Sequence, residues 1–542
     1  MNKQFLFIVL LLIVGIAAFL LLQDSPVEET QHQQEQQVVE ETEESTNPKY
    51  GGTFVFGRGG DSVGLDPIQE TDGESFKVAQ QIFDTLVQYE PDNTDVIPAL
   101  AKEWEVSDDG TVWTFNLREG VEFHDGTPFN AEAVVFNFER WLFEDHEYHF
   151  GGEFPYVRYQ FGGFPGIVKE INAVDEYTVE FVLNKPQGPF LNNLAMVCFS
   201  ISSPTAVKKY GEDYFKNPVG TGPFKFVEWE QDDRITLEVN EDFWDGRAYL
   251  DKIIFRSIPD NAARYMELQA GSIDMMDSLS PEDVDSVRSN SEFELLLRPS
   301  NNIGYFSMNF EMSPFDNVKV RKAMNYAIDR QSIVDAYYAG LGEPAKNSMP
   351  PSLWRYNDDI PAYEYNPEKA KELLTEAGYP DGFEFDFWYM PVPRPYFPQP
   401  KLIAQSMQNY FSEIGLTANL VTYDWSTYLD KNENKKAQTF LLGWTCYNGD
   451  PGTFLFALLD KVNVRNNYAS EELNEVLIEA QTTVDYQDRV ELYREAQDII
   501  YDDVPWVPVV HSIPPLASKN IVKNYIPNPT GTEKFTRVWL DI

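Results

Sequence analysis

The chain has 542 residues, of which 43% are hydrophobic and 14% aromatic, enough for large cores in two or three domains. Its 87 acidic and 42 basic residues give a net charge of −45, which argues against nucleic acid or an anionic membrane surface as a partner. The two cysteines are too few for a disulfide framework or a thiolate metal site. Cys198 lies in the apolar run LAMVCFSI, so we expect a small core residue rather than a bridge to Cys446.

The N-terminal residues predict a membrane segment followed by a linker. Lys3 precedes an unbroken apolar run from Phe5 to Leu22, near the lower length limit for a spanning helix. Neither a small-residue cleavage site nor a cysteine for lipid attachment follows, which favours an uncleaved signal anchor over a removed signal. Residues 23–49 are rich in Glu and Gln and typical of a disordered, acidic linker. We therefore expect residues 1–22 to anchor the chain in the cell membrane, with the rest on the extracytoplasmic side.

The folded part begins at Tyr50 with a strand that runs into glycines. The run GRGGDS is not a dinucleotide-binding loop, because Ser62 occupies the place of the third glycine. Apolar residues then recur on one helical face from Glu74 to Tyr89, which predicts a helix. The loop before this helix, Thr71 to Gly73, is placed to present backbone amides to a ligand.

Short alternating strands and amphipathic helices follow, the pattern of an α/β protein with several domains. The predicted strands cover Trp113–Leu117, Thr178–Leu183, Phe224–Glu230, Ile235–Asn240 and Ile253–Ile258. The predicted helices cover Ala131–Leu142, Asn261–Ala270, Val318–Ile328, Pro367–Ala377, Pro400–Ile414, Glu471–Thr483 and Gln487–Tyr501.

One cation stands out in the proline-rich segment WYMPVPRPYFPQP, from Trp388 to Pro400. No helix or strand ladder continues through prolines at this spacing, so we expect a stiff wall of defined shape. Arg394 lies on this wall with Tyr389, Tyr396 and Phe397 close in sequence. Its guanidinium is able to grip a carboxylate with two parallel hydrogen bonds while the rings exclude water. The alternative is a surface loop whose arginine pairs with a nearby glutamate.

Six further motifs point to one protein family. They are LREGVEFHDGTPFNAEAV within 104–135, GTGPFKF at 220–226, KVRKAMNYAIDR at 319–330, PPSLWRYNDD at 350–359, YNPEKAKELLTEAGY at 365–379 and GWTCYNGDP at 443–451. Together with the Arg394 segment they resemble the family 5 extracellular solute-binding proteins of ABC importers, and most of all the dipeptide-binding proteins. The likeness covers residues 50–542. It implies a two-lobed α/β fold of the periplasmic-binding-protein type (type II, three domains), with a hinge and an interlobe ligand cleft.

The resemblance also implies domain boundaries and a binding site. Domain I is expected to comprise 50–94, 219–300 and 508–542, domain II 95–218, and domain III 301–507. In the relatives, the arginine of the MPVxRPY segment pairs with the peptide carboxylate, and a threonine loop and the GWT strand end touch the peptide. The ligand-binding residues implied here are Thr71, Arg394, Pro395, Tyr396, Trp444, Thr445, Cys446 and Tyr447.

One position departs from the family pattern. Dipeptide-binding relatives read GWTGDNGDP and hold the peptide ammonium with the first aspartate, where this chain has Tyr447. An ammonium taken out of water needs an opposing charge, and a ring face supplies only about 0.5–2 kcal/mol. Asp450 is a possible substitute for the missing carboxylate. Three ligand classes therefore remain: a dipeptide with its amine held differently, a longer or modified peptide, and a glutathione-like or haem-like carboxylate without a free amine nearby.

An extracellular hydrolase is the alternative from another class, because 87 carboxylates provide many candidate catalytic pairs. The chain has no HExxH, GxSxG or P-loop motif, so we expect no catalytic residue. His146 and His149 lack an evident third ligand, and we expect neither a metal nor a cofactor. The resemblance implies a monomer that captures a small peptide and delivers it to an ABC permease driven by separate ATPase subunits.

Overall fold

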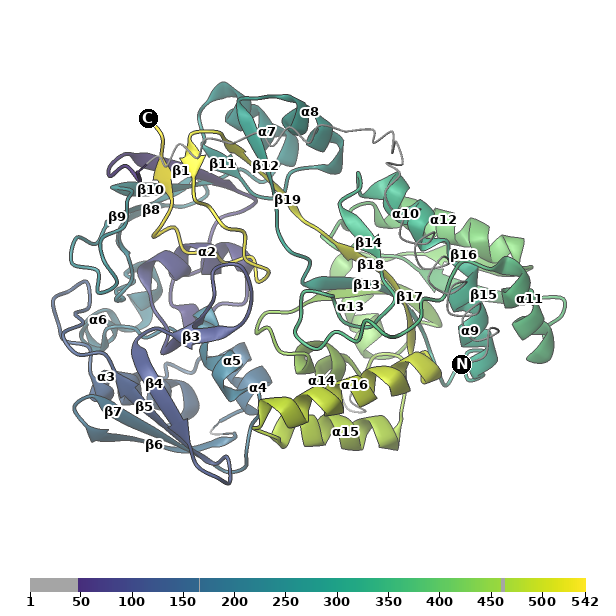
Figure 1. The fold of residues 1–542 in the computed structure, drawn as a ribbon, viewed down its shortest axis with the longest axis horizontal. Coiled ribbons are helices and arrows are strands. Elements are labelled where there is room, and N and C mark those ends of the chain that lie inside the picture. Colours follow the sequence, from purple (N-terminus) through teal and green to yellow (C-terminus); the bar gives the residue numbers. More distant parts are fainter. Residues whose placement is uncertain (1–46, 165, 460–463) are drawn as a thin grey trace, which may run out of the picture. The chain divides into compact units, whose positions relative to one another are not determined.

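Three β-sheets with helices around them organise the computed structural model, which describes residues 47–164, 166–459 and 464–542 (Figure 1). Residues 48–542 form one unit. This arrangement confirms the predicted α/β class. The predicted anchor and most of the acidic linker lie outside the described residues. Within those ranges, no helix is both long enough and apolar enough to cross a membrane.

The three sheets differ in strand direction and in their place along the chain. The seven-stranded sheet has the order β12 (Phe293–Leu297), β19 (Pro515–Lys519), β11 (Met275–Met276), β1 (Thr53–Arg58), β10 (Lys252–Ser257), β9 (Arg234–Val239) and β8 (Phe224–Glu230). The four-stranded sheet has the order β4 (Ala101–Val106), β5 (Val112–Leu117), β7 (Thr178–Leu183) and β6 (Val168–Asp175). The six-stranded sheet has the order β14 (Gly342–Pro344), β18 (Trp506–Ser512), β13 (Asn302–Met308), β17 (Thr439–Thr445), β15 (Glu384–Trp388) and β16 (Thr417–Val421). All pairs in the four-stranded sheet are antiparallel, whereas the other two sheets are mixed.

Each sheet has helices in the chain segments that carry its strands. Near the seven-stranded sheet in sequence are α2 (Gly73–Ile82), α7 (Asn261–Ala270) and α8 (Val284–Ser289). The segment with the four-stranded sheet carries α3 (Ala131–Leu142), α4 (Pro155–Phe161), α5 (Phe190–Leu194) and α6 (Pro204–Tyr210). The segment with the six-stranded sheet carries α9 (Val318–Ala327), α10 (Arg330–Tyr337), α11 (Pro367–Glu376), α12 (Pro400–Glu413), α13 (Trp425–Glu433), α14 (Gly452–Leu459), α15 (Glu471–Thr482) and α16 (Tyr486–Asp503).

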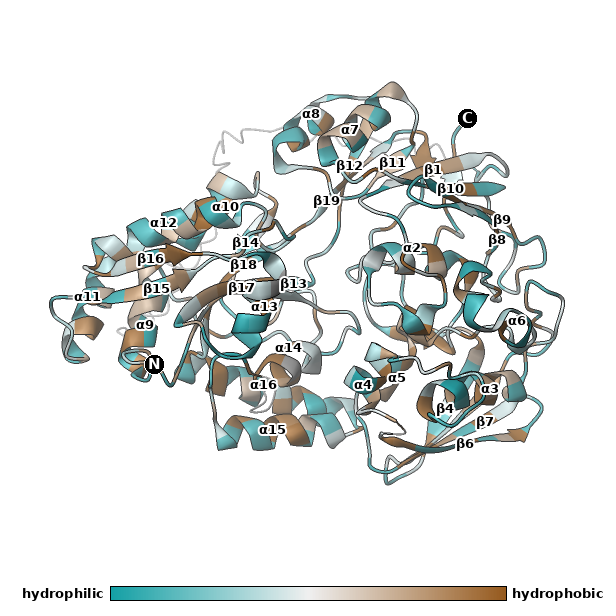
Figure 2. Ribbon diagram, turned by 180° about the vertical axis from the view of Figure 1, so that it is seen from behind, coloured by the Kyte–Doolittle hydropathy of each residue, from teal (hydrophilic) through white to brown (hydrophobic). Residues whose placement is uncertain are grey.

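The buried apolar residues separate into distinct cores that follow the sheets. The largest core covers the six-stranded sheet, where Phe306 of β13 contacts Phe387 of β15 and Phe411 of α12 with ring centroids 5.1 and 5.4 Å apart. The four-stranded sheet has its own core around Phe115 and Phe181. Apolar residues concentrate on the central strands in Figure 2. Each sheet therefore has the buried apolar surface that its part of the fold requires.

Two chain segments connect the seven-stranded sheet to the six-stranded sheet. One runs from β12 to β13 and the other from β18 to β19, as Figure 1 shows. The Arg298 amide donates to the Pro514 carbonyl at 3.0 Å, and the Asn302 side chain bonds the backbone of Ser512. The two segments are thus joined to each other, the arrangement expected of a two-stranded hinge.

Most element predictions agree with the structure to within two residues, but the helix predicted from Glu74 to Tyr89 is wrong in its second half. Helix α2 ends at Ile82, whose carbonyl accepts the Gly222 amide at 2.9 Å. A side chain at Gly222 would lie 2.6 Å from the Ile82 carbonyl carbon, so only glycine permits this approach. Beyond the helix, Val87–Tyr89 (β2) pairs with Val96–Pro98 (β3). Tertiary pairing therefore overrides the helical periodicity.

The last predicted domain boundary falls inside a strand. Residue 508 lies inside β18, which pairs with β13 in the six-stranded sheet. The segment returning to the seven-stranded sheet therefore begins after Ser512. The division itself stays a prediction.

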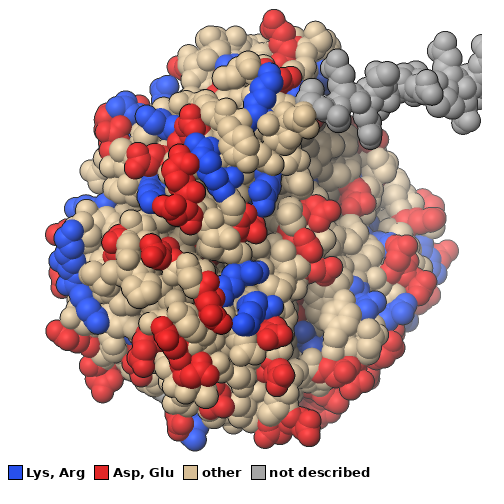
Figure 3. Space-filling view, turned by 60° about the vertical axis from the view of Figure 1, so that its left-hand side comes forward, with Lys and Arg blue, Asp and Glu red and all other residues tan. Residues whose placement is uncertain are grey.

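Acidic side chains are spread over the face shown in Figure 3, with basic ones interspersed. Many of the ion pairs among the described residues join exposed partners, such as Lys371 with Glu368 and Arg494 with Asp359. Such pairs contribute little stability individually. The surface charge therefore bears on solubility rather than on the fold.

Candidate functional site

Arg394 lies at a tight turn between β15 and α12. Its backbone amide donates to the Phe397 carbonyl at 3.0 Å, and the Phe397 amide returns a bond to the Arg394 carbonyl at 2.9 Å. Pro395 and Tyr396 form the tip between them. Arg394 is partly buried, and its guanidinium donates to the Pro393 carbonyl at 3.2 Å and lies over the Trp425 ring, 4.8 Å from its centroid. Among the described residues, no carboxylate lies within ion-pair distance of Arg394, so its charge is available to a ligand.

Two glycines allow this turn to lie directly on the six-stranded sheet. A Cβ atom at Gly443 of β17 would come within 2.2 Å of the Tyr396 ring, and one at Gly304 of β13 within 2.8 Å of the Phe397 ring. The Tyr338 hydroxyl donates to the Tyr396 carbonyl at 2.8 Å. The sequence analysis missed these three supporting residues, although glycine inside an apolar strand is a known signal of close backbone approach. The turn is thereby held in one orientation.

The loop after β17 contains the other predicted contact residues. Thr445 pairs with Asn302 at the end of β17, and the Cys446 amide and carbonyl both bond to Asn301 in the first connecting segment. Cys446 is fully buried, and burial raises the pKa of its thiol to about 12. Cys198 is also a buried free thiol. Cys446 therefore contributes its backbone rather than a reactive sulfur.

Tyr447 is the residue through which this loop meets other parts of the chain. Its ring lies edge-on to Trp444, 6.4 Å away, and to Tyr156 of α4, 6.3 Å away. Tyr156 in turn contacts Phe76 of α2 at 6.0 Å. The surrounding protein removes water from the Tyr447 hydroxyl and raises its pKa although the residue is 42% exposed, and the positive charge of Arg394 opposes this rise. The structure thus brings Tyr447, Trp444 and Arg394 into one neighbourhood, and adds Tyr156, for which the sequence offered no signal.

Thr71 is exposed directly before the N-terminus of α2. Asp72 caps this helix, accepting the Ser75 amide at 2.8 Å. Neighbouring Glu70 is buried, and burial together with the carboxylates of Asp72 and Asp66 raises its pKa to about 8. At neutral pH Glu70 therefore carries a proton. Thr71 itself makes no ring contact or side-chain bond to the Tyr447 group within the described residues.

Asp450, the possible substitute for the missing ammonium-binding carboxylate, is occupied by internal contacts. Its carboxylate is fully buried and bonds to Arg489 at 2.5 Å, to the Tyr493 hydroxyl at 2.8 Å and to the Gly452 amide at 2.9 Å. These partners use the lone pairs of both oxygens and neutralise the charge. Asp450 therefore fastens the loop to α16 and is not free to receive a ligand ammonium.

Asn448 connects the same loop to the segment with the four-stranded sheet. Its side-chain amide donates to the side-chain oxygen Oδ1 of Asn193 in α5 at 2.9 Å, in a buried position. A Cβ atom at Gly449 would lie 2.3 Å from Thr94. The loop between Thr445 and Pro451 is therefore in contact with all three sheet-bearing parts of the fold.

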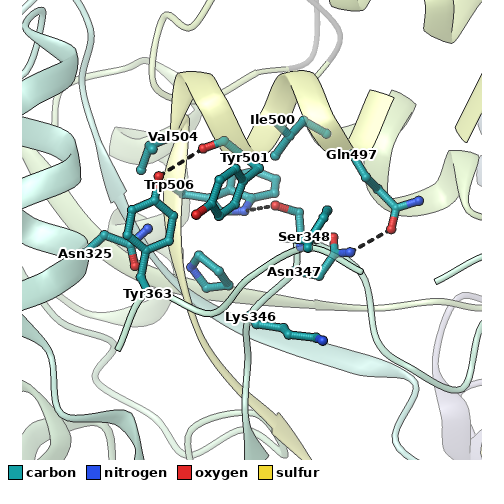
Figure 4. Close-up of a pocket in the computed structure, with 12 residues that line it drawn as sticks. Asn325, Lys346, Asn347, Ser348, Tyr363, Gln497, Ile500, Tyr501, Val504 and Trp506 are labelled. Carbon is teal, nitrogen blue, oxygen red and sulfur yellow. Dashed lines mark hydrogen bonds between the residues drawn. The ribbon is translucent and has the colours of Figure 1, made fainter. Parts of the chain in front are cut away.

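A small cavity lies elsewhere, between the six-stranded sheet and α16 (Figure 4). Its volume is about 20 Å³, enough for a water molecule. Trp506 bonds to Ser348 at 2.9 Å and Asn347 to Gln497 at 2.7 Å across its wall. None of the predicted ligand-binding residues lines it, so it is an internal packing cavity and not the candidate site.

Sheets joined by a paired two-segment connection fit the fold expected of a solute-binding protein of the periplasmic-binding type. Comparison with known proteins agrees: the profile of the bacterial extracellular solute-binding proteins, family 5 (middle region) matches residues 95–466. The chain belongs to this family.

Individual relatives carry different ligand names. Heme-binding protein A of Haemophilus influenzae is 39% identical over 507 residues, covering 90% of this chain and 92% of the relative. The dipeptide-binding protein of Escherichia coli is 36% identical over 512 residues, covering 90% and 95%. The solved structure of HbpA2 from Haemophilus parasuis superposes with a TM-score of 0.85 at 35% identity, covering 91% of this chain and all of the other. Overall identity therefore does not separate one ligand name from another.

Proposed function

We propose that this protein is the extracytoplasmic binding component of an ABC importer for small peptides bearing a free carboxylate. A dipeptide is the smallest ligand that we expect it to carry. One observation carries the proposal: the Arg394 guanidinium lies on a rigid turn, stacked on Trp425 and without a carboxylate partner among the described residues. Such a guanidinium has donors left to bind an anion with charge-assisted hydrogen bonds. The family and the dipeptide-binding relative support a peptide as the anion's carrier.

The mechanism is capture between the lobes followed by delivery. The peptide carboxylate pairs with Arg394, and backbone groups of the Thr71 loop and of Trp444 to Cys446 pair with the peptide main chain. Because the ligand touches both lobes only when they are closed, binding stabilises the closed form. The closed form then docks on a permease with separate ATPase subunits. The chain has no catalytic step in this role and acts as a monomer.

The domain and membrane assignments belong to the same proposal. Domain I comprises 50–94, 219–300 and the segment after Ser512, domain II comprises 95–218, and domain III comprises 301–512. Residues 1–22 anchor the protein in the cell membrane, and residues 23–49 allow the binding domains to reach the permease. A haem-like or glutathione-like carboxylate is the second candidate ligand, favoured by Tyr447 and by the haem-named relative.

Calorimetric titration of the full-length protein tests the carboxylate anchor. We expect alanyl-leucine or its N-acetyl form to bind, and the C-terminal amide of the better ligand to bind at least tenfold more weakly. Arg394→Ala should cause a similar loss, because an unpaired ligand carboxylate costs more than about 1.4 kcal/mol. Lys401→Ala is the matched control, since Lys401 is an exposed cation at the start of α12. Equal affinity of the Arg394→Ala variant for the acid would show that the anchor is misassigned.

A further inference from the structure

Tyr447 is the side chain that its loop presents to solvent. The adjacent residues Cys446, Asn448 and Asp450 are at most 3% exposed, whereas Tyr447 is 42% exposed. Its ring contacts Trp444 and Tyr156, and Tyr156 contacts Tyr159, which is itself 74% exposed. We call Trp444, Tyr447, Tyr156 and Tyr159 the aromatic patch. It provides ring faces and hydroxyl groups but no charge of its own.

The turn that carries Arg394 packs against the strand end of the aromatic patch, because its Tyr396 ring lies on Gly443, the residue before Trp444. The charge of Arg394 acts on the Tyr447 hydroxyl. Within the described part of the chain, no carboxylate forms a hydrogen bond with the Tyr447 hydroxyl, and the cation that acts on it is Arg394. A ligand whose carboxylate pairs with Arg394 therefore places its neighbouring atoms against the rings. The electrostatic environment there favours an uncharged group over a cation.

Asp450 and Asp72 are the two candidate carboxylates for binding a ligand ammonium, and both already accept hydrogen bonds within the fold. Asp450 is enclosed by Arg489 and Tyr493, as described above. Asp72 acts on Tyr156, but one of its oxygens accepts the Ser75 amide and so caps α2, and the other is buried away from solvent. Neither carboxylate can turn to a ligand without losing a bond that holds the fold.

The free energies of desolvation and of ring contact favour an uncharged ligand nitrogen over an ammonium at this position. Removing an ammonium from water costs several kcal/mol, and a ring face returns about 0.5–2 kcal/mol. An acylated nitrogen avoids this cost, because it is neutral and its acyl group can pack on the rings. The same aromatic surface therefore penalises one form of a ligand and stabilises the other.

We propose that the aromatic patch beside Arg394 makes the protein selective for carboxylate ligands whose nitrogen is acylated, over the same ligands with a free ammonium. This inference rests on the proposed function, because it takes Arg394 as the anchor of the ligand carboxylate. Tyr447 is then the residue that determines specificity.

Titration of the full-length protein with alanyl-leucine and N-acetyl-alanyl-leucine tests the inference. We expect the wild type to bind the acetylated form at least tenfold more tightly. Tyr447→Asp places a carboxylate in the patch and should reverse this preference, whereas Tyr447→Phe keeps the rings and should retain it. Arg394→Ala should weaken binding of both forms.

The outcomes separate this inference from the proposed function. If the wild type binds the free dipeptide as tightly as the acetylated one, the inference is wrong. If Arg394→Ala then still weakens binding of the dipeptide, the role of Arg394 as the carboxylate anchor is supported. An unchanged preference in Tyr447→Asp would also overturn the inference. If the wild type binds neither form at millimolar concentration, both the inference and a dipeptide-sized cargo are wrong.

Discussion

Arg394 and Arg489 are both stacked on a tryptophan, and they differ in what completes their charge. Arg489 lies 5.2 Å from the Trp354 ring centroid, is 3% exposed and bonds Asp450. Burial alone would lower the pKa of Arg489, but Asp450 and Tyr493 raise it overall. Arg394 lies 4.8 Å from the Trp425 centroid, is half-buried and has no carboxylate partner in the described ranges. The same residue type thus serves structure where an internal anion accompanies it, and is available to a ligand where none does.

Breaking the internal pair should produce the largest effect. Arg489→Met leaves the Asp450 carboxylate buried without its cation, which costs about 3–5 kcal/mol of the free energy of unfolding. Denaturant unfolding measures this loss. Arg494→Met is a matched control on the same helix, because Arg494 is 44% exposed and its pair with Asp359 is worth no more than about 1 kcal/mol. Equal losses in the two variants would contradict the distinction between a structural and a surface arginine.

Moving the turn that carries Arg394 should have an intermediate effect on stability and a clear effect on binding. Gly443→Ala places a methyl group 2.2 Å from the Tyr396 ring and 2.4 Å from the Ile303 carbonyl. We expect a loss of about 1–3 kcal/mol in stability, because the ring must shift in a closely packed position. The binding of a carboxylate ligand should weaken as well, since Tyr396 and Arg394 belong to one turn.

A glycine without neighbours provides the control for this substitution. Gly126 lies in an exposed turn, but its positive φ of 78° would add strain of its own. Gly73, at the first position of α2, has no atom within 4 Å of its Cβ and an ordinary φ. Gly73→Ala should therefore leave stability within about 0.5 kcal/mol of the wild type. Ligand affinity unchanged in Gly443→Ala would show that the turn does not depend on the sheet beneath it.

The contrast between the two arginines also shows what the sequence could predict. The prolines on either side of Arg394 exclude helix and strand, so a rigid turn with one cation was predictable from local rules. The pair of Asp450 with Arg489 spans 39 residues and two helices, and nothing local distinguishes Arg489 from Arg494, the other cation of α16. The contact of Tyr447 with Tyr156 likewise depends on how the segments fold together. Periodicity predicted most helices well, and failed in residues 83–89, where pairing with another strand decided the conformation.

The carboxyl groups of Glu70 and Asp450 also differ in the charges that lie beside them. Asp450 has a cation beside it, whereas the charges that act on Glu70 are the carboxylates of Asp72 and Asp66. Burial and these neighbours raise the pKa of Glu70 from 4.5 to about 8. The folded protein therefore holds a proton that the unfolded chain releases near pH 4.5. The stability associated with this carboxyl is complete below that pH and is lost as the pH rises to about 8.

Glu70→Gln should remove this pH dependence, because the amide keeps a hydrogen-bond donor toward Asp72 and does not titrate. The difference in melting temperature between the variant and the wild type should rise in favour of the variant as the pH goes from about 5 to about 9. The expected rise is on the order of 3 °C. Glu368→Gln is the control, since Glu368 is 80% exposed on α11 and should leave the two melting curves parallel. Parallel curves for Glu70→Gln would mean that Glu70 is already ionised at neutral pH. Asp72 would then face a second negative charge at the N-terminus of α2, and would be available to a ligand ammonium after all.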